Sequence, residues 1–140
     1  MATRREAREW AVQLLFQLDM NPSDDLDAVF EAFWSDKEAE QRSRRFTEAL
    51  VRGVRKDLAV IDQMVQTVAE HWDIRRMGVL ERNVIRLGVY ELVNRKDIPA
   101  AVTINEAVDI SKYFSTDESG RFVNGILDRI RIMLNRPPRD

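Results

Sequence analysis

The chain has 140 residues, of which 44% are hydrophobic and 33% charged, a composition typical of one folded domain rather than of a disordered segment. It lacks cysteine, a signal peptide and any run near the roughly 20 apolar residues of a membrane span, so we expect a soluble, cytoplasmic protein without thiol chemistry. Its formal net charge of −2 means that any nucleic-acid site has to be a local basic patch, since nucleic-acid-binding domains are more often basic overall.

Two helices are predicted at the start of the chain. Residues 3–20 open with a capping box formed by Thr3 and Glu6, which satisfies unpaired backbone N–H groups. Apolar residues then follow helical spacing along one face at Ala7, Trp10, Ala11, Leu14, Leu15 and Leu18. After Asn21-Pro22, residues 23–34 predict a second helix. Its apolar face comprises Leu26, Val29, Phe30, Phe33 and Trp34.

One long helix is predicted over residues 46–72. Apolar residues recur there at helical spacing as Leu50, Val54, Leu58, Ile61, Val65, Val68 and Trp72. Gly53 is a weak point at which this helix could kink. The strongly polar segment 35–45 before it is expected to contain a loop.

The second half of the chain predicts three more helices. Residues 80–93 are apolar nearly all round, which is typical of a helix at the centre of a fold. A second capping box at Thr103 and Glu106 starts the next helix, and the last follows the polar turn 115–119. Gly125 within the last helix predicts close approach of a neighbour. Because few runs alternate in polarity like a strand and the β-branched residues fall at helical spacing, the predicted fold class is all-α, with six or seven helices.

The sequence contains no motif for catalysis or for metal or cofactor binding. His71 is the only histidine, and no partners stand at the spacing of a catalytic triad or a metal site. The phosphate-binding, dinucleotide-binding and nucleophile-elbow motifs are also missing. We therefore predict a protein that is not an enzyme and needs no metal or cofactor.

The first helix carries three arginines in its first two turns: Arg4, Arg5 and Arg8. Arg4 and Arg8 are one turn apart on one face, so their guanidinium groups could bind successive phosphates. Taken alone, the pattern rather favours an ordinary exposed face on which Arg5 pairs with Glu9. Cations are unfavourable near a helix N-terminus, which favours a reason outside helix stability.

A second candidate site lies at Arg121 and Phe122. Arginine beside an aromatic ring offers a charge for phosphate and a face for a base, although Phe122 also has the spacing of a core residue. A third basic cluster has interspersed acidic residues and is interpreted as a solvated face. It comprises Arg42, Arg44, Arg45, Arg52, Arg55 and Lys56.

Several segments together resemble the NusB family of transcription antitermination factors. They are RREARE at 4–9, AVQLLF at 11–16, ERNVIRLGVYEL at 81–92, INEAV at 104–108 and FVNGILD at 122–128. The resemblance implies a single NusB-like domain over residues 1–140, built from two packed helical subdomains without a catalytic site. It also implies antitermination at ribosomal RNA operons, where NusB and the ribosomal protein NusE bind boxA RNA within the antitermination complex of RNA polymerase.

The resemblance also assigns candidate residues. RNA contacts are expected from Arg4, Arg5, Arg8, Arg121 and Phe122, with Glu118 in the adjacent turn tuning affinity. Phe16 and Glu81 match positions associated with the NusE surface. Because Glu6 interrupts a short arginine run, we expect weak RNA binding by the isolated chain and tighter binding with NusE.

Other interpretations stay open at the level of sequence. One is a helical adaptor with a NusB-like fold that binds only protein. Another is an RNA-binding module related to ribosomal RNA methyltransferases, which would need a further catalytic domain with its cysteines. The resemblance also leaves open a homodimer that hides the arginines. Trp10 and Trp34 are interpreted as core residues rather than as its interface.

Overall fold

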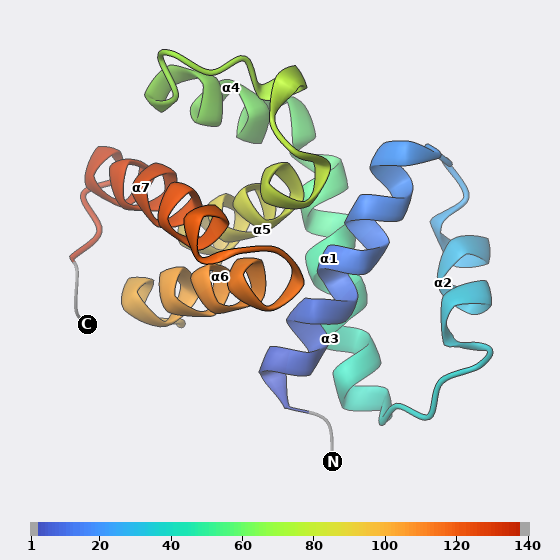
Figure 1. Cartoon of the computed structure of the whole chain (residues 1–140). Helices are drawn as coiled ribbons and strands as arrows, with labels where there is room; N and C mark the ends of the chain where they lie inside the picture. The colour runs from blue at the N-terminus through green and yellow to red at the C-terminus, as the bar shows by residue number, and fades with distance from the viewer. Residues whose placement is uncertain (1–2, 138–140) are drawn as a thin grey trace.

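A computed structural model describes residues 3–137, and within that range the chain folds into seven α-helices and one short 3₁₀ helix, without a strand (Figure 1). The helices are α1 (Arg4–Met20), α2 (Leu26–Trp34), α3 (Gln41–Lys56), α4 (Leu58–Val68), η1 (Ile74–Arg76), α5 (Val79–Asn94), α6 (Ala100–Phe114) and α7 (Asp117–Met133). The predicted all-α class is confirmed.

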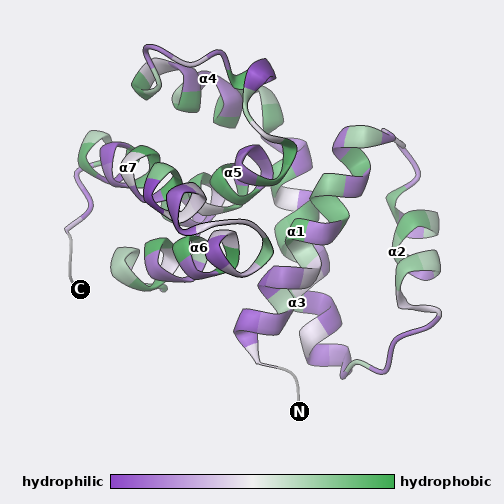
Figure 2. Ribbon diagram, in the orientation of Figure 1, coloured by the Kyte–Doolittle hydropathy of each residue, from purple (hydrophilic) through white to green (hydrophobic). Residues whose placement is uncertain are grey.

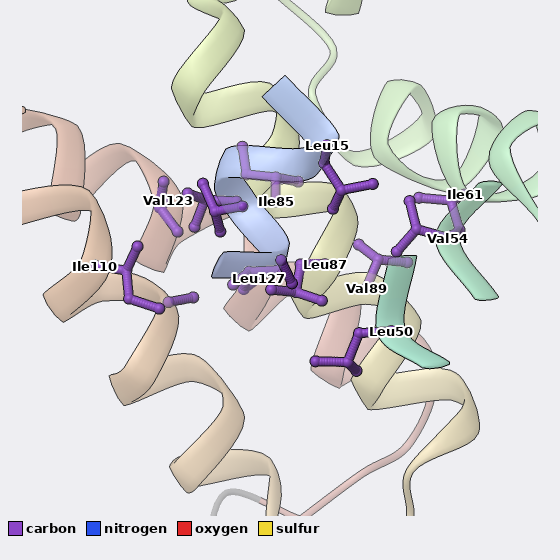
Figure 3. Close-up of a cluster of buried hydrophobic side chains, with 14 of the residues drawn as sticks. Leu15, Leu50, Val54, Ile61, Ile85, Leu87, Val89, Ile110, Val123 and Leu127 are labelled. Atoms are coloured by element: carbon purple, nitrogen blue, oxygen red, sulfur yellow. The ribbon is translucent and has the colours of Figure 1, made fainter. Parts of the chain in front are cut away.

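Helix α5 lies at the centre of the fold. Residues 83–89 are all buried, and the helix packs against α1, α3, α4, α6 and α7. Figure 3 shows Ile85, Leu87 and Val89 of α5 surrounded by apolar side chains from all five of these helices. The apolar circumference of residues 80–93 thus correctly predicted a central helix, because only a helix with neighbours on every side can bury such a surface.

Helices α1–α3 and α4–α7 form two groups that meet at α5 (Figure 1). On the outside of the first group, α2 is held by Trp34, whose ring meets Trp10 of α1 edge to face at 5.3 Å between centroids. The Trp34 indole also donates a hydrogen bond of 2.8 Å to Glu48 of α3. Both tryptophans therefore pack within the chain, as expected from their helical spacing.

A polar network joins α1, α4 and α5. The Arg86 guanidinium donates to both carboxylate oxygens of Asp62 at 2.8 Å and to Asp19 at 3.1 Å. Asp19 also accepts hydrogen bonds from Arg82 and Asn83. Burial alone would raise the pKa of Asp19, but these hydrogen bonds and the arginine charges outweigh it and hold the pKa below its usual value.

The structure corrects the boundaries of two predicted helices. The helix expected over residues 46–72 is two helices that join at Asp57, and the first begins already at Gln41, inside the segment expected to hold a loop. Helix α6 begins at Ala100, so Thr103 is buried within its first turns and is no cap. The Thr103 hydroxyl instead contacts Glu91 of α5 at 3.4 Å. Tertiary contacts override the local capping signal there.

Gly53 and Gly125, two of the glycines in helices, also differ from expectation. A Cβ atom on Gly53 would lie 2.2 Å from the Tyr90 ring, so α3 and α5 approach closely at this glycine, and α3 continues through it. A Cβ atom on Gly125 would meet nothing within 4 Å, which makes the predicted close approach at Gly125 wrong.

We expect opposite effects when each glycine is replaced by alanine. Gly125→Ala should raise the free energy of unfolding by up to about 1 kcal/mol, because alanine is the better helix former and has open space there. Gly53→Ala should lower the free energy of unfolding, because overpacking against Tyr90 costs about 1–3 kcal/mol. Urea denaturation of both variants checks this, and an equal gain for the two would contradict the close approach at Gly53.

Candidate functional site

The first turn of α1 begins with its predicted cap. The Thr3 hydroxyl accepts the backbone N–H of Glu6 at 3.1 Å, and this start places three arginines on different sides of the helix. Arg4 is exposed, and its guanidinium carbon lies 5.0 Å from the ring centroid of Phe46 of α3. It forms no direct ion pair with a carboxylate in residues 3–137 and attracts Asp97 only at longer range, so Arg4 can receive an anion from solvent.

Arg5 points towards α6. Its guanidinium donates to Glu106 and, at 2.9 Å, to Asp109, rather than pairing with Glu9 as the spacing suggested. The hydrogen bond to Glu106 is the main reason why the pKa of Arg5 is raised. Arg5 stays partly exposed, but an RNA phosphate has to compete with two carboxylates for it.

Arg8 points into the protein, and this corrects its expected role as a phosphate contact. Its side chain is 3% exposed, and Nε and Nη2 donate to the two oxygens of Glu91 at 2.9 and 2.8 Å. A buried guanidinium requires a partner of opposite charge, and Glu91 of α5 supplies it. Arg4 and Arg8 therefore do not form a pair of outward-facing phosphate contacts.

A groove of about 350 Å³ lies between η1, the start of α5 and the start of α7. It brings together three of the predicted site residues, Glu81, Glu118 and Phe122. The Ser119 hydroxyl donates to Glu81 at 2.8 Å, which ties α7 to α5 at the floor of the groove. The remaining lining residues are Trp72, Arg76, Met77, Gly78, Ser115, Thr116 and Ser119.

Phe122 combines the two roles that its sequence context left open. Its ring is half-buried and packs against the core, and it also lines the groove, where it meets Trp72 edge to face at 5.5 Å between centroids. Trp72 itself is 56% exposed in the loop after α4. Trp72 does not stand out in the sequence as a site residue, because its spacing from Val68 matches the apolar face of a helix that ends before it.

Arg121 and Phe16 lie outside this groove. Arg121 is exposed near the start of α7 and makes no hydrogen bond or ion pair with any residue in the described range. Phe16 is 40% exposed on α1, one turn from the exposed Met20. The charge of Arg121 is therefore accessible to an anion, and Phe16 and Met20 present an apolar face to solvent.

Arg42 is a further basic residue whose position sequence reasoning did not foresee. Because α3 starts at Gln41, Arg42 lies in its first turn, and it lines a pocket together with Arg4 and Phe46. In the sequence it was one of six interspersed cations without a distinguishing signal.

Metal-binding clusters and membrane-spanning helices are absent from residues 3–137. No group of three or more histidine, aspartate or glutamate side chains could hold a metal ion there. No helix in the same range is both long and apolar enough to cross a membrane.

Comparisons with known proteins agree along nearly the whole chain. The profile of the NusB family matches residues 5–131. The transcription antitermination protein NusB of Sorangium cellulosum is 39% identical, over 100% of this chain and 99% of its own length. That of Myxococcus xanthus is 41% identical, over 98% of this chain and 100% of its own length.

Solved structures show the same fold. T. maritima NusB has a TM-score of 0.84 and 39% identity, covering 92% of this chain and 90% of that one. A crystal structure of the antitermination factors NusB and NusE in complex with double-stranded RNA contains a chain with a TM-score of 0.83 and 27% identity, covering 93% of this chain and 96% of that one. With a family profile that spans residues 5–131 and relatives similar along their full length, this chain belongs to the NusB family.

Proposed function

We propose that this chain is a transcription antitermination factor that binds the boxA element of nascent ribosomal RNA together with the ribosomal protein NusE. The observation that carries this proposal is the similarity to curated NusB antitermination proteins over essentially the full chain. A NusB chain of the same fold has been crystallised with NusE and RNA, which supports both partners. The role is recruitment into the antitermination complex of RNA polymerase in the cytoplasm, and it involves no catalysis.

In this proposal, arginines bind the RNA phosphates and aromatic rings stack on a base. Arg4 and Arg121 supply exposed positive charge to backbone phosphates, which gives affinity that falls with salt and depends little on sequence. An unstacked base can stack on the Phe122 ring where it lines the groove, and Trp72 beside it enlarges the aromatic surface. Glu118 in the same groove repels phosphate and so tunes affinity.

NusE contacts different residues from the RNA in this proposal, although one of them lies in the same groove. Phe16 and Glu81 contribute to that surface, Phe16 through its exposed apolar ring and Glu81 through its carboxylate in the groove. Because Glu81 and Phe122 line the same groove, NusE bound at Glu81 would extend the surface available to RNA. The chain acts as one NusB-like domain, since α5 packs against helices of both groups.

A titration of labelled boxA RNA tests the proposed function. We expect weak binding by the isolated chain and tighter, boxA-specific binding after purified NusE is added, since the only outward arginines of α1 are Arg4 and the partly neutralised Arg5. A scrambled RNA of equal length is the control. Nanomolar boxA affinity without NusE at physiological salt would contradict the dependence on NusE. Absence of RNA binding even with NusE would leave a helical adaptor that binds only protein.

A further inference from the structure

Three arginine side chains surround one phenylalanine at the end of the first helical group. The guanidinium carbons of Arg4, Arg8 and Arg95 lie 5.0, 5.7 and 5.4 Å from the ring centroid of Phe46. Distances below about 6 Å are favourable because the face of an aromatic ring carries negative charge. Phe46 of α3 therefore holds together cations that come from α1 and from the C-terminal end of α5.

A pocket of about 340 Å³ opens beside this ring, and we call it the Phe46 pocket. It is lined by Thr3, Arg4, Ala7, Arg42, Ser43 and Phe46. The pocket lies where the first turns of α1 and α3 come together, and Figure 2 shows both of these turns as hydrophilic. Two arginines from different helices thus line one hollow in the surface.

The charge of the Phe46 pocket is positive after its internal pairs are counted. Glu91 neutralises Arg8, and Asp97 pairs with Arg95 at 3.0 Å. Arg42 is exposed and forms no hydrogen bond or ion pair within residues 3–137. Arg4 lies over the Phe46 ring and attracts Asp97 only at longer range, and Asp97 is already paired with Arg95. Two positive charges therefore remain for a ligand.

The chemistry of the pocket favours a phosphate over a base. The Phe46 ring is half-buried and already has the guanidinium groups of Arg4 and Arg95 near its centre, so a base stacking on it would have to compete with them. Guanidinium groups bind phosphate oxygens through paired N–H donors, and such contacts carry no sequence information.

We propose that the Phe46 pocket binds a backbone phosphate of RNA, with Arg42 joining Arg4 as a contact. This inference rests on the proposed RNA-binding function and adds α3 to the interface. Arg42 belongs to the third basic cluster, which was interpreted from the sequence as a solvated face. It differs from the other members of that cluster because it shares a pocket with Arg4.

The test compares Arg42→Ala with Arg55→Ala, in the presence of NusE. Arg55 lies in the last turn of the same helix, about 20 Å away along its axis, and its loss changes the net charge equally. We expect Arg42→Ala to weaken the binding of boxA and of scrambled RNA by the same factor, about fivefold at 0.1 M salt. The salt slope, which is the slope of log affinity against log salt concentration, should become shallower by about 0.7, the value for one phosphate contact on a single strand. Arg42→Lys should retain most of the slope, and Arg55→Ala should bind like the wild type.

The outcomes separate this inference from the proposed function. If the wild type prefers boxA while Arg42→Ala and Arg55→Ala have the same affinity and salt slope, the Phe46 pocket is no phosphate site and the antitermination role is unaffected. If Arg42→Ala weakens boxA but not the scrambled RNA, the contact is to a base and the phosphate assignment is overturned. If the wild type binds no RNA even with NusE, both proposals fall together.

Discussion

Replacing Arg8 with alanine is expected to lower the free energy of unfolding by about 3–5 kcal/mol, the cost of breaking a buried ion pair from one side. Arg8 is 3% exposed and Glu91 1% exposed, and two hydrogen bonds join them. Without the guanidinium, the Glu91 carboxylate is left in the core, and the Thr103 hydroxyl at 3.4 Å is its one remaining hydrogen-bond donor among residues 3–137. A change of this size is a large fraction of the stability of a typical domain.

Urea denaturation of Arg8→Ala measures this effect, with Arg4→Ala as the matched control. Arg4 is exposed and four residues earlier on α1, so its loss should cost no more than about 1 kcal/mol, the contribution of an exposed cation–π contact such as the one with Phe46. A double variant, Arg8→Met with Glu91→Met, should recover much of the loss because it removes both buried charges. Equal stability of Arg8→Ala and Arg4→Ala would show that Arg8 does not occupy the internal position described here.

The position of Arg8 also governs how RNA-binding variants are interpreted. Weaker RNA binding by Arg8→Ala would follow from the loss of folded protein, and it would be no sign of a phosphate contact. Variants of the α1 surface should therefore be restricted to Arg4 and Arg5, whose guanidinium groups reach solvent.

Phe122→Ala is expected to weaken boxA binding roughly 5- to 150-fold, because stacking of one base on an aromatic side chain contributes about 1–3 kcal/mol. The Phe122 ring lines the groove between α5 and α7 and packs against Trp72. Since no charge is lost, the salt dependence of binding should stay as in the wild type.

Phe33→Ala provides the control for the loss of an aromatic ring. Phe33 is half-buried like Phe122 and also meets a tryptophan edge to face, but it lies on α2, at the opposite side of the molecule from α7 (Figure 1). Both variants should be compared by RNA titration in the presence of NusE at a temperature at which each is folded. If Phe122→Ala and Phe33→Ala bind boxA equally well, Phe122 is a packing residue and no base contact.

Local signals in the sequence were reliable where a helix buries a face along its whole length. The spacing of apolar residues predicted α1, α2 and α7 close to their observed positions, and the apolar circumference of residues 80–93 predicted the central α5. The same spacing was misleading across Asp57, because the apolar residues of α3 and α4 keep one helical spacing although the helix is interrupted between them.

The sequence by itself determined the all-α class, the central helix and the family, because these depend on patterns within a few turns or on matching segments in order. Only the tertiary structure decided which cations face solvent. Arg8 meets Glu91 83 residues away, and Arg5 meets Glu106 101 residues away. Whether an arginine is buried and paired or open to a phosphate depends on such distant partners, and helical periodicity carries no information about them.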